Sequence, residues 1–585
     1  MIKNRGETMK KIMTLYKSVG KYWPFAILTP LFMVGEAVLE LQIPGKISEI
    51  ITYLQNLGEA PIDSAFMWGR ALWLIVFSLA SMACGVLGAL FGARASAGFS
   101  ANLKNRLFRK VQTFSFSNID KYSSSSLITR MNTDVQWVNM SFSMSIRMIF
   151  RSPTIFAYAL IKASRISKDL MLVYLIAIPI LVVGLTLIHV FAHPQFERGV
   201  KKIDKVNEVV EENVRGVRVV KSFTREEDEI KKFDQENNLL YKYFKRGQTI
   251  VQFTSPLMMI AIYTVILLIV LIGVNRIESG QIYEMVTYSL NILIALNMLS
   301  MVFTFMVISK PSRERIYEVL TEVPTIKSPE NAIEEVKDGS VEFKNVFFKY
   351  NLESEKYVLN NINLRIKSGE TVGILGTTGS SKTTLISLIA RLYDTLDGDV
   401  LVGGVNVKDY DLEVLRDAVS VVLQKNQLFS GTIIDNLRWG KEDATLDEIK
   451  EACKIAQASS FIEAMPQQYE TKIEQGGSNV SGGQKQRLCI ARAILKDPKI
   501  LILDDSMSAV DTKTDALIRA GLKEYKKDIT KIIVAQRYMS VQDADKIIII
   551  DNGEILDVGT HEELLKKSET YQEIYHSQNQ EASNE

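Results

Sequence analysis

Cysteine is scarce in this sequence: only three occur among 585 residues, at Cys84, Cys453 and Cys489. They are scattered, with neither metal-ligand spacing nor an obvious pairing, so we expect reduced structural thiols. Thiols of this kind are typical of a reducing compartment, and we therefore expect the half of the chain that carries Cys453 and Cys489 to lie in the cytosol.

A strong charge of one sign is also absent. Lys and Arg number 69 against 67 Asp and Glu, which gives a formal net charge of +2. Neither acidity nor basicity of the whole chain therefore indicates a nucleic-acid partner. The basic start MIKNRGETMKK is not followed by a small-residue cleavage site, so we expect no removable signal peptide and assign residues 1–21 to a cytosolic N-terminal segment.

Long apolar runs, by contrast, fill the first half of the chain, and hydrophobic residues make up 47% of the whole. The length suggests about three or four compact units. A helix needs about 20 apolar residues to cross the hydrocarbon core of a bilayer. Six segments meet this requirement: Tyr22–Ile43, which contains Pro24 and ends near Pro44, Phe66–Phe91, Val138–Ile161, Leu170–Phe191, Ile250–Val274 and Met285–Ile308.

The spacing of these segments predicts their orientation. The gaps after the first, third and fifth segments are short, whereas those after the second and fourth run for tens of residues. The long gaps carry the basic runs ANLKNRLFRK and RGVKKIDK, and positive charge marks the cytoplasmic side of a membrane protein. We therefore expect a multi-pass protein of the plasma membrane, with both termini and both long loops in the cytosol.

The long gaps have the pattern of helices. KKIDKVNEVVEENVRGVRVVKSFTREEDEIKKF shows helix-like apolar spacing and has almost no breaker apart from Gly216. The favoured interpretation is that membrane helices continue into the cytosol as stalks, with turning points near Ser115–Tyr122 and Gly216–Thr224. A charged solvated loop is the alternative, although disordered segments are usually poorer in Val, Ile and Phe.

Two carboxylates, Glu36 and Glu40, lie in the first apolar segment and share one helix face. Charge inside a membrane is costly, so such residues usually face a wet cavity or a partner. One interpretation is a cavity contact for cationic cargo; the other is a salt bridge with Arg147 or Arg151. Met and aromatic residues of the last two segments either line an adaptable pocket or pack in the ordinary way: Phe253, Met258, Met259, Met298, Met301 and Phe303.

The pattern changes after the last apolar segment. A polar linker over residues 311–337 is punctuated by Pro324 and Pro329, and VEFKNVFFKY then alternates as a half-buried strand does. Further on, the stretch GTTGSSKTT lies between the short buried strand TVGILG and the helix-like LISLIARLY. This strand–loop–helix context is the one that a phosphate-binding loop requires.

Such a loop binds nucleotide phosphates through its backbone N–H groups and the following helix N-terminus. Lys382 would reach the terminal phosphates, and Thr383 would bind magnesium. The loop residues expected to contact the nucleotide are Gly376, Thr377, Thr378, Gly379, Ser380, Ser381, Lys382, Thr383 and Thr384.

Two further motifs support a nucleotide site. ILILDD is an apolar strand that ends in acids, and its Asp504 can hold the magnesium shell. VSGGQKQR opens a predicted helix with small residues, which makes it a second anion-binding surface. One nucleotide rarely needs both surfaces, so this second one would serve a nucleotide held by another subunit. Its residues are Ser481, Gly482, Gly483 and Gln484.

With these motifs together, the chain resembles a half-transporter of the ATP-binding cassette exporter family over nearly its whole length. The resemblance implies six membrane helices with long cytosolic extensions, residues 22–310, fused to an α/β P-loop ATPase domain, residues 338–585. It implies that Tyr350 stacks on adenine and that Gln424 links the magnesium site to the membrane loops. It also matches SAVD, Ser508–Asp511, to the loop after the magnesium strand, with Asp511 serving the partner's site.

The resemblance further implies ATP and Mg2+ as ligands and a second half-transporter as partner. The ion would be held by Thr383, Gln424 and Asp504, partly through water. Two chains would pair so that each nucleotide lies between the P-loop of one chain and the SGGQ of the other.

Three positions depart from the family pattern. Ser381 replaces the second P-loop glycine, Asp505 stands where the family has glutamate, and Gln536 stands where it has histidine. Aspartate is one methylene shorter, so its carboxylate falls short of the attacking water, a displacement of about 1 Å that can cost about 10²-fold in rate. Glutamine cannot take up the proton and charge that histidine can.

These departures predict a degenerate site that holds ATP and hydrolyses it slowly, with neutral drift in an active enzyme as the alternative. The chain is then similar to one subunit of the heterodimeric bacterial multidrug exporters, whose partner carries the missing Glu and His. We expect export of hydrophobic or amphipathic small molecules across the lipid bilayer, driven by hydrolysis of the β–γ phosphoanhydride. The alternatives are a lipid or peptide exporter of the same architecture and an ATP-gated channel or regulatory subunit.

Overall fold

The structure, a computed structural model, describes residues 11–377, 379–506 and 510–582, and divides into two compact units. The first unit contains the described residues up to Gln112 together with Ser125–Thr321. The second contains Thr113–Ser124 and the chain from Glu322 onward. A short piece of the first long loop therefore belongs to the same compact unit as the C-terminal half.

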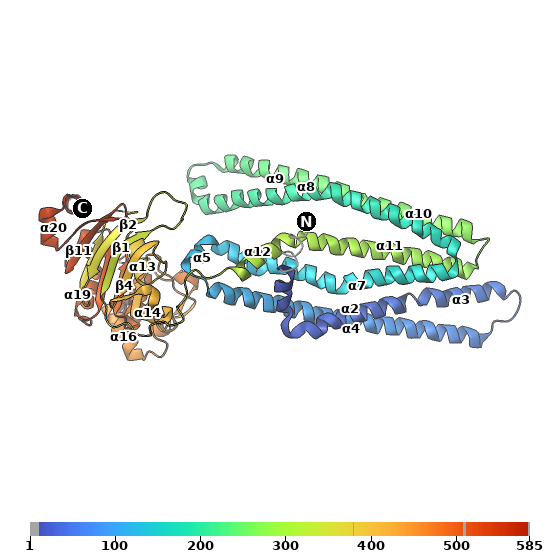
Figure 1. Cartoon of the computed structure of the whole chain (residues 1–585), viewed down its shortest axis with the longest axis horizontal. Helices are drawn as coiled ribbons and strands as arrows, with labels where there is room; N and C mark the ends of the chain where they lie inside the picture. The colour runs from blue at the N-terminus through green and yellow to red at the C-terminus, as the bar shows by residue number, and fades with distance from the viewer. Residues whose placement is uncertain (1–10, 378, 507–509, 583–585) are drawn as a thin grey trace. The chain divides into compact units, whose positions relative to one another are not determined.

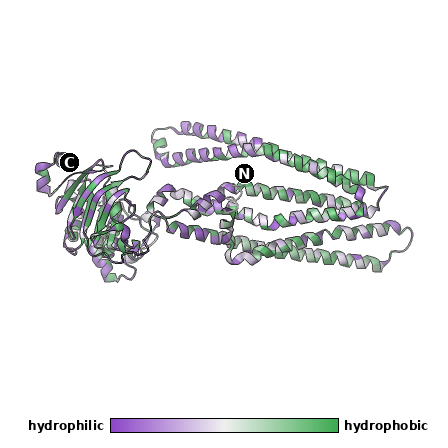
Figure 2. Cartoon of the chain, in the orientation of Figure 1, coloured by the Kyte–Doolittle hydropathy of each residue, from purple (hydrophilic) through white to green (hydrophobic). Residues whose placement is uncertain are grey.

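The first unit is entirely helical in its described residues. Its elements are η1 (Lys17–Tyr22), α2 (Trp23–Glu40), α3 (Ile43–Asn56), α4 (Ser64–Gln112), α6 (Ser124–Thr129), η2 (Arg130–Asp134), α7 (Val135–Ile166), α8 (Lys168–Ser222), α9 (Glu226–Gln252), α10 (Thr254–Gly273), α11 (Ser279–Ile308) and α12 (Lys310–Thr321). Figure 1 shows α8, α9 and α10 as one long hairpin. In Figure 2 the N-terminal part of α8 and all of α10 are mainly hydrophobic, whereas the C-terminal part of α8 and α9 are largely hydrophilic.

Five helical runs in the described chain are long and apolar enough to cross a membrane. They are Lys11–Asn56, Ser64–Gln112, Lys168–Ser222, Glu226–Gly273 and Ser279–Ile308. The remaining predicted segment, Val138–Ile161, does form a helix, α7, but its composition does not meet the same criterion. Arg147, Arg151 and several serines interrupt its apolar character. The predicted count of six spanning helices is therefore not confirmed.

The prediction that the first apolar segment ends near Pro44 is wrong. The chain turns at Leu41 and Gln42, and α3 then continues to Asn56 with Pro44 in its first turn. Proline is tolerated there because the N–H that it lacks would have no intrahelical partner. Pro30, in contrast, lies inside α2.

The prediction of helical stalks is confirmed. α8 runs without a break to Ser222, and α9 returns from Glu226. Gly216 lies inside α8, so a turning element that begins at Gly216 is wrong: the chain reverses over residues 223–225. One glycine costs a helix only about 1 kcal/mol, which a helix of this length tolerates.

The other turning point is confirmed by a short helix, α5 (Phe116–Lys121), in the second unit. Ser115 precedes it and forms a capping box with Asn118. The predicted linker over residues 311–337 does not begin at residue 311, because helix α12 continues to Thr321. The chain is non-helical from there to the first strand.

The second unit is an α/β domain built on three sheets. The six-stranded sheet has the order β12-β11-β3-β10-β9-β6, a four-stranded sheet has the order β2-β1-β4-β5, and β7 pairs with β8. The strands are β1 (Val341–Phe348), β2 (Leu359–Ile366), β3 (Thr371–Leu375), β4 (Asp397–Val402), β5 (Val405–Asn406), β6 (Val419–Val422), β7 (Gly431–Thr432), β8 (Lys472–Ile473), β9 (Ile500–Asp504), β10 (Thr530–Ala535), β11 (Lys546–Asp551) and β12 (Glu554–Gly559).

Helices and helical turns connect these strands. They are α13 (Lys382–Ile389), η3 (Val407–Asp409), α14 (Leu412–Ala418), α15 (Ile433–Leu437), α16 (Leu446–Ile455), α17 (Ser459–Glu463), η4 (Gln468–Glu470), η5 (Gln475–Gly477), α18 (Gly482–Leu495), α19 (Thr512–Glu524), η6 (Tyr538–Ser540), α20 (His561–Lys567) and α21 (Glu569–Ala582). Figure 1 shows α13 and α14 next to β4, and α19 and α20 near β11.

The central strands are buried on both faces. On β9, Ile500 and Ile502 belong to one apolar cluster, and Leu501 and Leu503 belong to another. Burial on both faces explains why the parallel strands read as continuous apolar runs such as ILIL. Because β3, β10 and β9 are parallel neighbours, their carboxyl ends, and the residues that follow them, meet at one edge of the sheet.

Candidate nucleotide-binding site

The phosphate-binding loop leaves β3 at Gly376 and enters α13 at Lys382. Lys382 is buried, and its Nζ donates to the carbonyl oxygens of Gly376 at 2.8 Å and Thr377 at 2.7 Å. It also donates to Ser380 Oγ at 3.2 Å. Burial lowers the pKa of Lys382, against the opposing effect of the nearby acids of β9 and its loop. Lys382 thus lies inside the loop, and its contact with the terminal phosphates stays a prediction. Thr378 lies outside the described residues.

The conformation of the loop explains why a glycine suits its end. Ser381 has φ 73° and ψ 19°, in the left-handed region, as it caps α13. Gly379 also has a positive φ, of 88°. An L-residue pays roughly 1–2 kcal/mol for left-handed backbone, whereas glycine pays almost nothing. The serine is therefore tolerated at a cost in backbone strain and keeps the N–H that a phosphate would use.

The predicted magnesium ligands Thr383 and Asp504 lie together. Thr383 Oγ1 donates to both carboxylate oxygens of Asp504, at 2.9 and 3.1 Å. Asp504 is 1% exposed, and its burial raises the pKa of its carboxyl, partly offset by the bond from Thr383. A hydroxyl and a carboxylate are oxygen donors of the kind that Mg2+ prefers. These two side chains fit the ion, which would neutralise phosphate charge next to Lys382.

Asp505, at the position of the catalytic acid, accepts two amide N–H groups on the same oxygen. Gln536 Nε2 lies 3.0 Å from Asp505 Oδ2, and Gln424 Nε2 lies 3.2 Å from it. The two sequence departures are therefore neighbours in space. In the described chain the amide of Gln424 donates to Asp505, and its place among the magnesium ligands stays a prediction.

Sequence reasoning missed Gln486, which lies in the first part of α18. Its Nε2 contacts the backbone carbonyl of Asp505 at 3.4 Å, and its side chain is 3% exposed. The only signal is its place in QKQR directly after the SGGQ motif, at a position that faces the domain interior.

Tyr350, the predicted adenine platform, lies beside the start of α13. Its hydroxyl shares a 3.0 Å hydrogen bond with Thr384 Oγ1, and 53% of the residue is exposed. Its ring packs edge to face against Phe348 and Tyr393. An exposed ring held by aromatic neighbours suits stacking on a base. Thr377 lies on the other side of the loop, with its Oγ1 3.2 Å from Asp551.

The SGGQ motif forms the N-terminus of α18. Ser481 and Gln484 form a capping box, in which Gln484 N donates to Ser481 Oγ and Ser481 N donates to Gln484 Oε1. Gly482 is exposed, and Gly483 is partly so. Among the described residues no hydrogen bond or ion pair joins this motif to the phosphate-binding loop of the same chain.

Asp511 caps another helix, α19. Its Oδ1 accepts the N–H of Thr514 at 2.9 Å, and this bond lowers the pKa of the Asp511 carboxyl. Residues 507–509, which include the start of the SAVD motif, lie outside the described residues.

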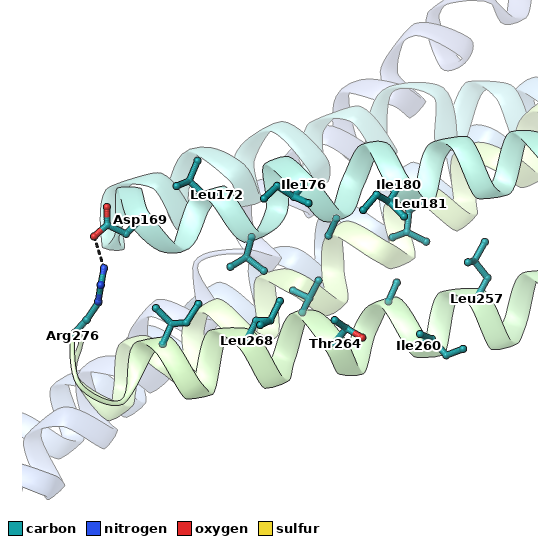
Figure 3. A pocket seen from close by; sticks show the side chains of 15 residues that line it. Asp169, Leu172, Ile176, Ile180, Leu181, Leu257, Ile260, Thr264, Leu268 and Arg276 are labelled. Atoms are coloured by element: carbon teal, nitrogen blue, oxygen red, sulfur yellow. Dashed lines mark hydrogen bonds and ion pairs between the residues drawn. The ribbon is translucent and has the colours of Figure 1, made fainter.

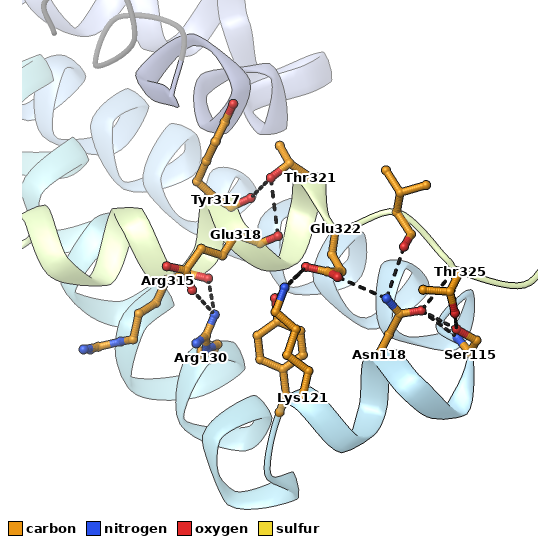
Figure 4. A network of polar contacts seen from close by, with 12 residues as sticks. Ser115, Asn118, Lys121, Arg130, Arg315, Tyr317, Glu318, Thr321, Glu322 and Thr325 are labelled. Atoms are coloured by element: carbon orange, nitrogen blue, oxygen red, sulfur yellow. Dashed lines mark hydrogen bonds and ion pairs between the residues drawn. The ribbon is translucent and has the colours of Figure 1, made fainter. Parts of the chain in front are cut away.

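The short helix α5 is held by the segment that follows α12, as Figure 4 shows. Glu322 accepts hydrogen bonds from Lys121 Nζ at 2.7 Å, Tyr122 OH at 2.9 Å and Asn118 Nδ2 at 3.1 Å. The hydrogen bond from Lys121 lowers the pKa of the Glu322 carboxyl. Ser115 Oγ and Thr325 Oγ1 lie 2.5 Å apart. The sequence carries no signal for this cluster, since its two halves are about 200 residues apart.

α5 also contacts the nucleotide side of the domain. Tyr393 OH donates to Asp120 at 2.5 Å, and the Tyr393 ring packs edge to face against both Phe116 and Tyr350. Burial and the Asp120 carboxylate raise the pKa of Tyr393. One side chain thus bridges the turning-point helix and the predicted adenine platform.

In the helical unit, the structure pairs Glu36 and Glu40 with one arginine. Arg151 Nε lies 3.3 Å from Glu36, and Arg151 Nη2 lies 3.0 Å from Glu40. Arg147, the other predicted partner, donates instead to the backbone carbonyl of Ala89 at 3.2 Å. The salt-bridge interpretation therefore describes this structure, and Arg151 is one of the polar residues that make α7 less apolar than its neighbours.

An apolar groove lies between α8 and α10, with a volume of about 700 Å³ (Figure 3). Leucine and isoleucine side chains line most of it, and an ion pair of Asp169 with Arg276 at 2.7 Å closes one end. The residues predicted either to line an adaptable pocket or to pack in the ordinary way differ in their burial. Met258 is buried, whereas four others are exposed in the single chain: Phe253, Met259, Met301 and Phe303. Met298 contacts Arg151 through its sulfur.

Comparison with known proteins places these features in one family. Sequence models match the chain as an ABC transporter transmembrane region over residues 33–307 and as an ABC transporter over residues 359–508. The chain is 35% identical over 572 residues to the uncharacterized ABC transporter ATP-binding protein YfiB of Bacillus subtilis, covering 96% of this chain and 98% of YfiB. It is 33% identical over 586 residues to YknU of the same organism, covering 97% of each.

The fold is also that of a solved exporter. A structure described as a bacterial Atm1-family ABC exporter with ATP bound superposes with a TM-score of 0.81 at 21% identity, covering 95% of this chain and 98% of the other. Membrane helices with long extensions and a P-loop ATPase domain define an ABC exporter half-transporter. The chain belongs to the ABC transporter family, and its ATPase domain couples ATP hydrolysis to transport.

Proposed function

We propose that this chain is one subunit of a heterodimeric exporter, that it holds ATP in a degenerate site, and that it contributes Ser481–Gln484 to the competent site of its partner. The cargo is a hydrophobic or amphipathic small molecule. The chain lies in the plasma membrane, with both termini and the ATPase domain in the cytosol.

The environment of Asp505 carries this proposal. Hydrolysis needs a group that accepts a hydrogen bond from the attacking water and a neighbour that takes up charge. The Asp505 oxygen already accepts the amides of Gln536 and Gln424. An amide N–H of Gln536 donates but does not take up a proton, and Asp505 is one methylene shorter than glutamate. Both changes slow the same chemical step.

The binding part of the site supports retention of nucleotide. Lys382 is held inside the loop, and Thr383 lies against Asp504 with a donor set that suits Mg2+. Tyr350 offers an exposed aromatic face. A site that keeps these groups and changes the hydrolytic ones binds ATP and turns it over slowly, which gives it the role of a clamp.

The signature motif supports a role at the nucleotide site of a second chain. Ser481 and the two glycines form an ordered helix N-terminus, which attracts phosphate through its N–H groups and dipole. Among the described residues no hydrogen bond or ion pair joins this surface to the chain's own phosphate loop, which leaves it available to the nucleotide of a second chain. A partner with the glutamate and histidine that this chain lacks makes that site fast.

The helical unit supports apolar cargo. The groove between α8 and α10 is lined mainly by aliphatic side chains, and large apolar side chains of α8 and α10 are exposed in the single chain. In a membrane unit such surfaces face lipid, a hydrophobic molecule or a partner's helices. The Arg151 pair with Glu36 and Glu40 leaves one carboxylate in excess, which suits cationic amphipaths.

The test measures ATP hydrolysis by the assembled pair after the partner's catalytic glutamate has been replaced by glutamine, so that only this chain's site can turn over. We expect very slow hydrolysis. Adding Asp505→Glu with Gln536→His to this chain should raise the rate by about 10² or more, because the base and the charge acceptor are restored.

Adding Lys382→Ala to that variant should remove the gain and so locate it at this site. Rapid hydrolysis by the unaltered chain in the silenced pair, or a gain that survives Lys382→Ala, would contradict the proposal. Uptake of a fluorescent cationic amphipath into inside-out vesicles tests the cargo, and ion conductance without uptake would instead favour an ATP-gated channel.

A further inference from the structure

A second pocket of the ATPase domain lies at the end of the sheet opposite the phosphate-binding loop. It has a volume of about 430 Å³, and its lining includes Thr371, the first residue of β3, and Lys531, the second residue of β10. Those residues pair with each other at the amino end of the strands, whereas Leu375 and Ala535 pair at the carboxyl end, next to Gly376. The pocket is therefore separate from the nucleotide site.

The floor of the pocket contains a buried cation. Lys531 is 4% exposed, and its Nζ reaches two neutral backbone carbonyls, those of Lys526 and Ile529, both at 3.3 Å. Within the described chain it forms no ion pair with a carboxylate. Burial lowers the pKa of Lys531, against the opposing influence of Asp528 and Asp545. A buried ammonium with long neutral contacts is costly and gains from an anion placed beside it.

More cations line the same pocket. Lys523 and Lys527 are exposed on its rim, and neither makes an ion pair within the described residues. Arg519 also lines it, already paired with Asp543 at 2.8 Å. The other lining acid, Asp545, accepts the backbone N–H of Thr371 at 2.8 Å. The lining therefore carries four cations against two carboxylates, and within the described residues none of the three lysines forms an ion pair.

The rest of the lining is apolar. Leu522, Ile533 and Ala544 contribute to the wall, beside the hydroxyl of Ser540. A volume of about 430 Å³ lies within the range of small-ligand sites and exceeds what a lone inorganic ion fills. The lining therefore suits a molecule with one multiply charged anionic group and a small organic body.

We propose that this pocket binds a small phosphorylated molecule, with its phosphate over Lys531 and between Lys523 and Lys527. Three lysines favour a phosphate over a single carboxylate, because a phosphate monoester carries a charge of about −1.5 to −2 near neutral pH. Bonds from charged donors to phosphate oxygens are also among the stronger hydrogen bonds in proteins. The proposal does not depend on the degenerate ATP site or on the heterodimer.

The test measures binding of radiolabelled inorganic pyrophosphate to the purified full-length chain by equilibrium dialysis. Lys382→Ala serves as the background, since pyrophosphate also binds the phosphate loop. We expect saturable binding to persist in Lys382→Ala and to weaken at least about tenfold when Lys531→Met is added, because one charged hydrogen-bond donor is removed. Absence of saturable binding in Lys382→Ala would overturn the proposal.

The matched control is Lys499→Met in the same background. Lys499 directly precedes the neighbouring strand β9, its Nζ donates to the Lys337 carbonyl, and it does not line the pocket. It should leave pyrophosphate affinity unchanged; a loss equal to that of Lys531→Met would show a general charge effect and overturn the site.

Methionine is chosen at 531 because replacing a buried unpaired charge by an apolar side chain is often neutral or stabilising. If that variant nevertheless fails to fold, the double variant Lys523→Ala with Lys527→Ala tests the proposal instead, because both side chains are exposed at the rim of the pocket. This pair should weaken binding at least about threefold, and unchanged affinity would overturn the proposal.

Discussion

Ser381 shows how a single backbone angle is linked to the chemistry of the site. Its φ of 73° places it in the left-handed region at the exact point where the phosphate loop becomes α13. The chain accepts this strain and keeps the N–H direction that an anion requires. The departure from glycine therefore affects stability more than phosphate binding, and it differs in kind from the changes at Asp505 and Gln536.

Ser381→Gly should stabilise the ATPase domain slightly. Relief of left-handed strain is worth roughly 1–2 kcal/mol, and the greater freedom of glycine in the unfolded chain takes back about 0.4–1 kcal/mol. We expect a net gain below about 1.5 kcal/mol and little change in ATP retention. Differential scanning calorimetry of the full chain, with the ATPase-domain transition followed, measures it.

Ser380→Gly is the matched control, since the same substitution one residue earlier relieves no positive φ and removes the hydroxyl that accepts from Lys382. It should destabilise the domain by roughly 0.5–1 kcal/mol or more. A shift of the same sign for both glycine variants would refute the strain argument.

The types of residue at the site were predictable from sequence. The side chains with which they form hydrogen bonds were only partly predictable. Lys382 and Thr383 follow from the local strand–loop–helix pattern, which fixes both residues within one turn of α13. The bond between Gln424 and Asp505 could not be predicted, because it depends on the pairing of strands that are far apart in sequence. Sequence pattern describes what a residue can do, and the register of the sheet decides which neighbour it meets.

At the scale of elements, α5 is held by contacts from Thr325 and Tyr393 and by an acidic side chain that follows the last helix of the membrane unit. Glu322 joins Lys121, Tyr122 and Asn118, and Asn118 is almost fully buried. α5 therefore belongs to the compact unit of the ATPase domain, although it comes from a loop between membrane helices. A helix of six residues is too short to persist by itself, so these contacts maintain it.

Glu322→Ala should loosen the attachment of α5 and, with it, the coupling of hydrolysis to transport. Three donors lose a hydrogen bond to Glu322, at about 0.5–1.5 kcal/mol for each bond. The Asn118 amide keeps its bond to the Val323 carbonyl at 3.1 Å. We expect the ratio of cargo transported to ATP hydrolysed to fall by about threefold or more, with ATP affinity preserved. Vesicle uptake and phosphate release, measured on the same sample, give this ratio.

Glu318→Ala is the control, because Glu318 pairs with Arg130 inside the helical unit and is 56% exposed at its side chain. Exposed pairs contribute little, so its ratio should stay near that of the unaltered chain. Equal losses in the two variants would mean that the Glu322 cluster has no special role in coupling.

Element boundaries were less predictable than element types. The stalk helices follow from apolar periodicity and are found. The position of Pro44 suggested that the first helix ends there. Proline is equally compatible with the first turn of a helix, and Pro44 in fact lies in the first turn of α3. Likewise Gly216 is a weak breaker in a long helix, and the chain reverses only after Ser222. Helix ends depend on tertiary contacts that a single sequence does not display.

At the scale of the whole molecule, the chain carries two candidate surfaces for ATP phosphates, and no hydrogen bond or ion pair joins them among the described residues. Lys382 belongs to the loop of its own site, and Ser481–Gln484 form the start of α18, without a bond between them in the described chain. Under the proposed function these surfaces serve different nucleotides. Damage to each should therefore affect the pair unequally, which is a property that no single-chain measurement reveals.

Gly482→Asp in this chain should lower ATP hydrolysis by the pair at least about 10²-fold, because a carboxylate would repel the nucleotide at the fast site. Aspartate in the first turn of α18 complements the helix dipole, so the fold should be retained. Lys382→Ala should lower the rate much less, because it weakens only the slow site. Steady-state hydrolysis and trapping of labelled ATP by each chain separate the two effects. Equal losses, or a larger loss with Lys382→Ala, would mean that both sites turn over alike and that the asymmetric assignment is wrong.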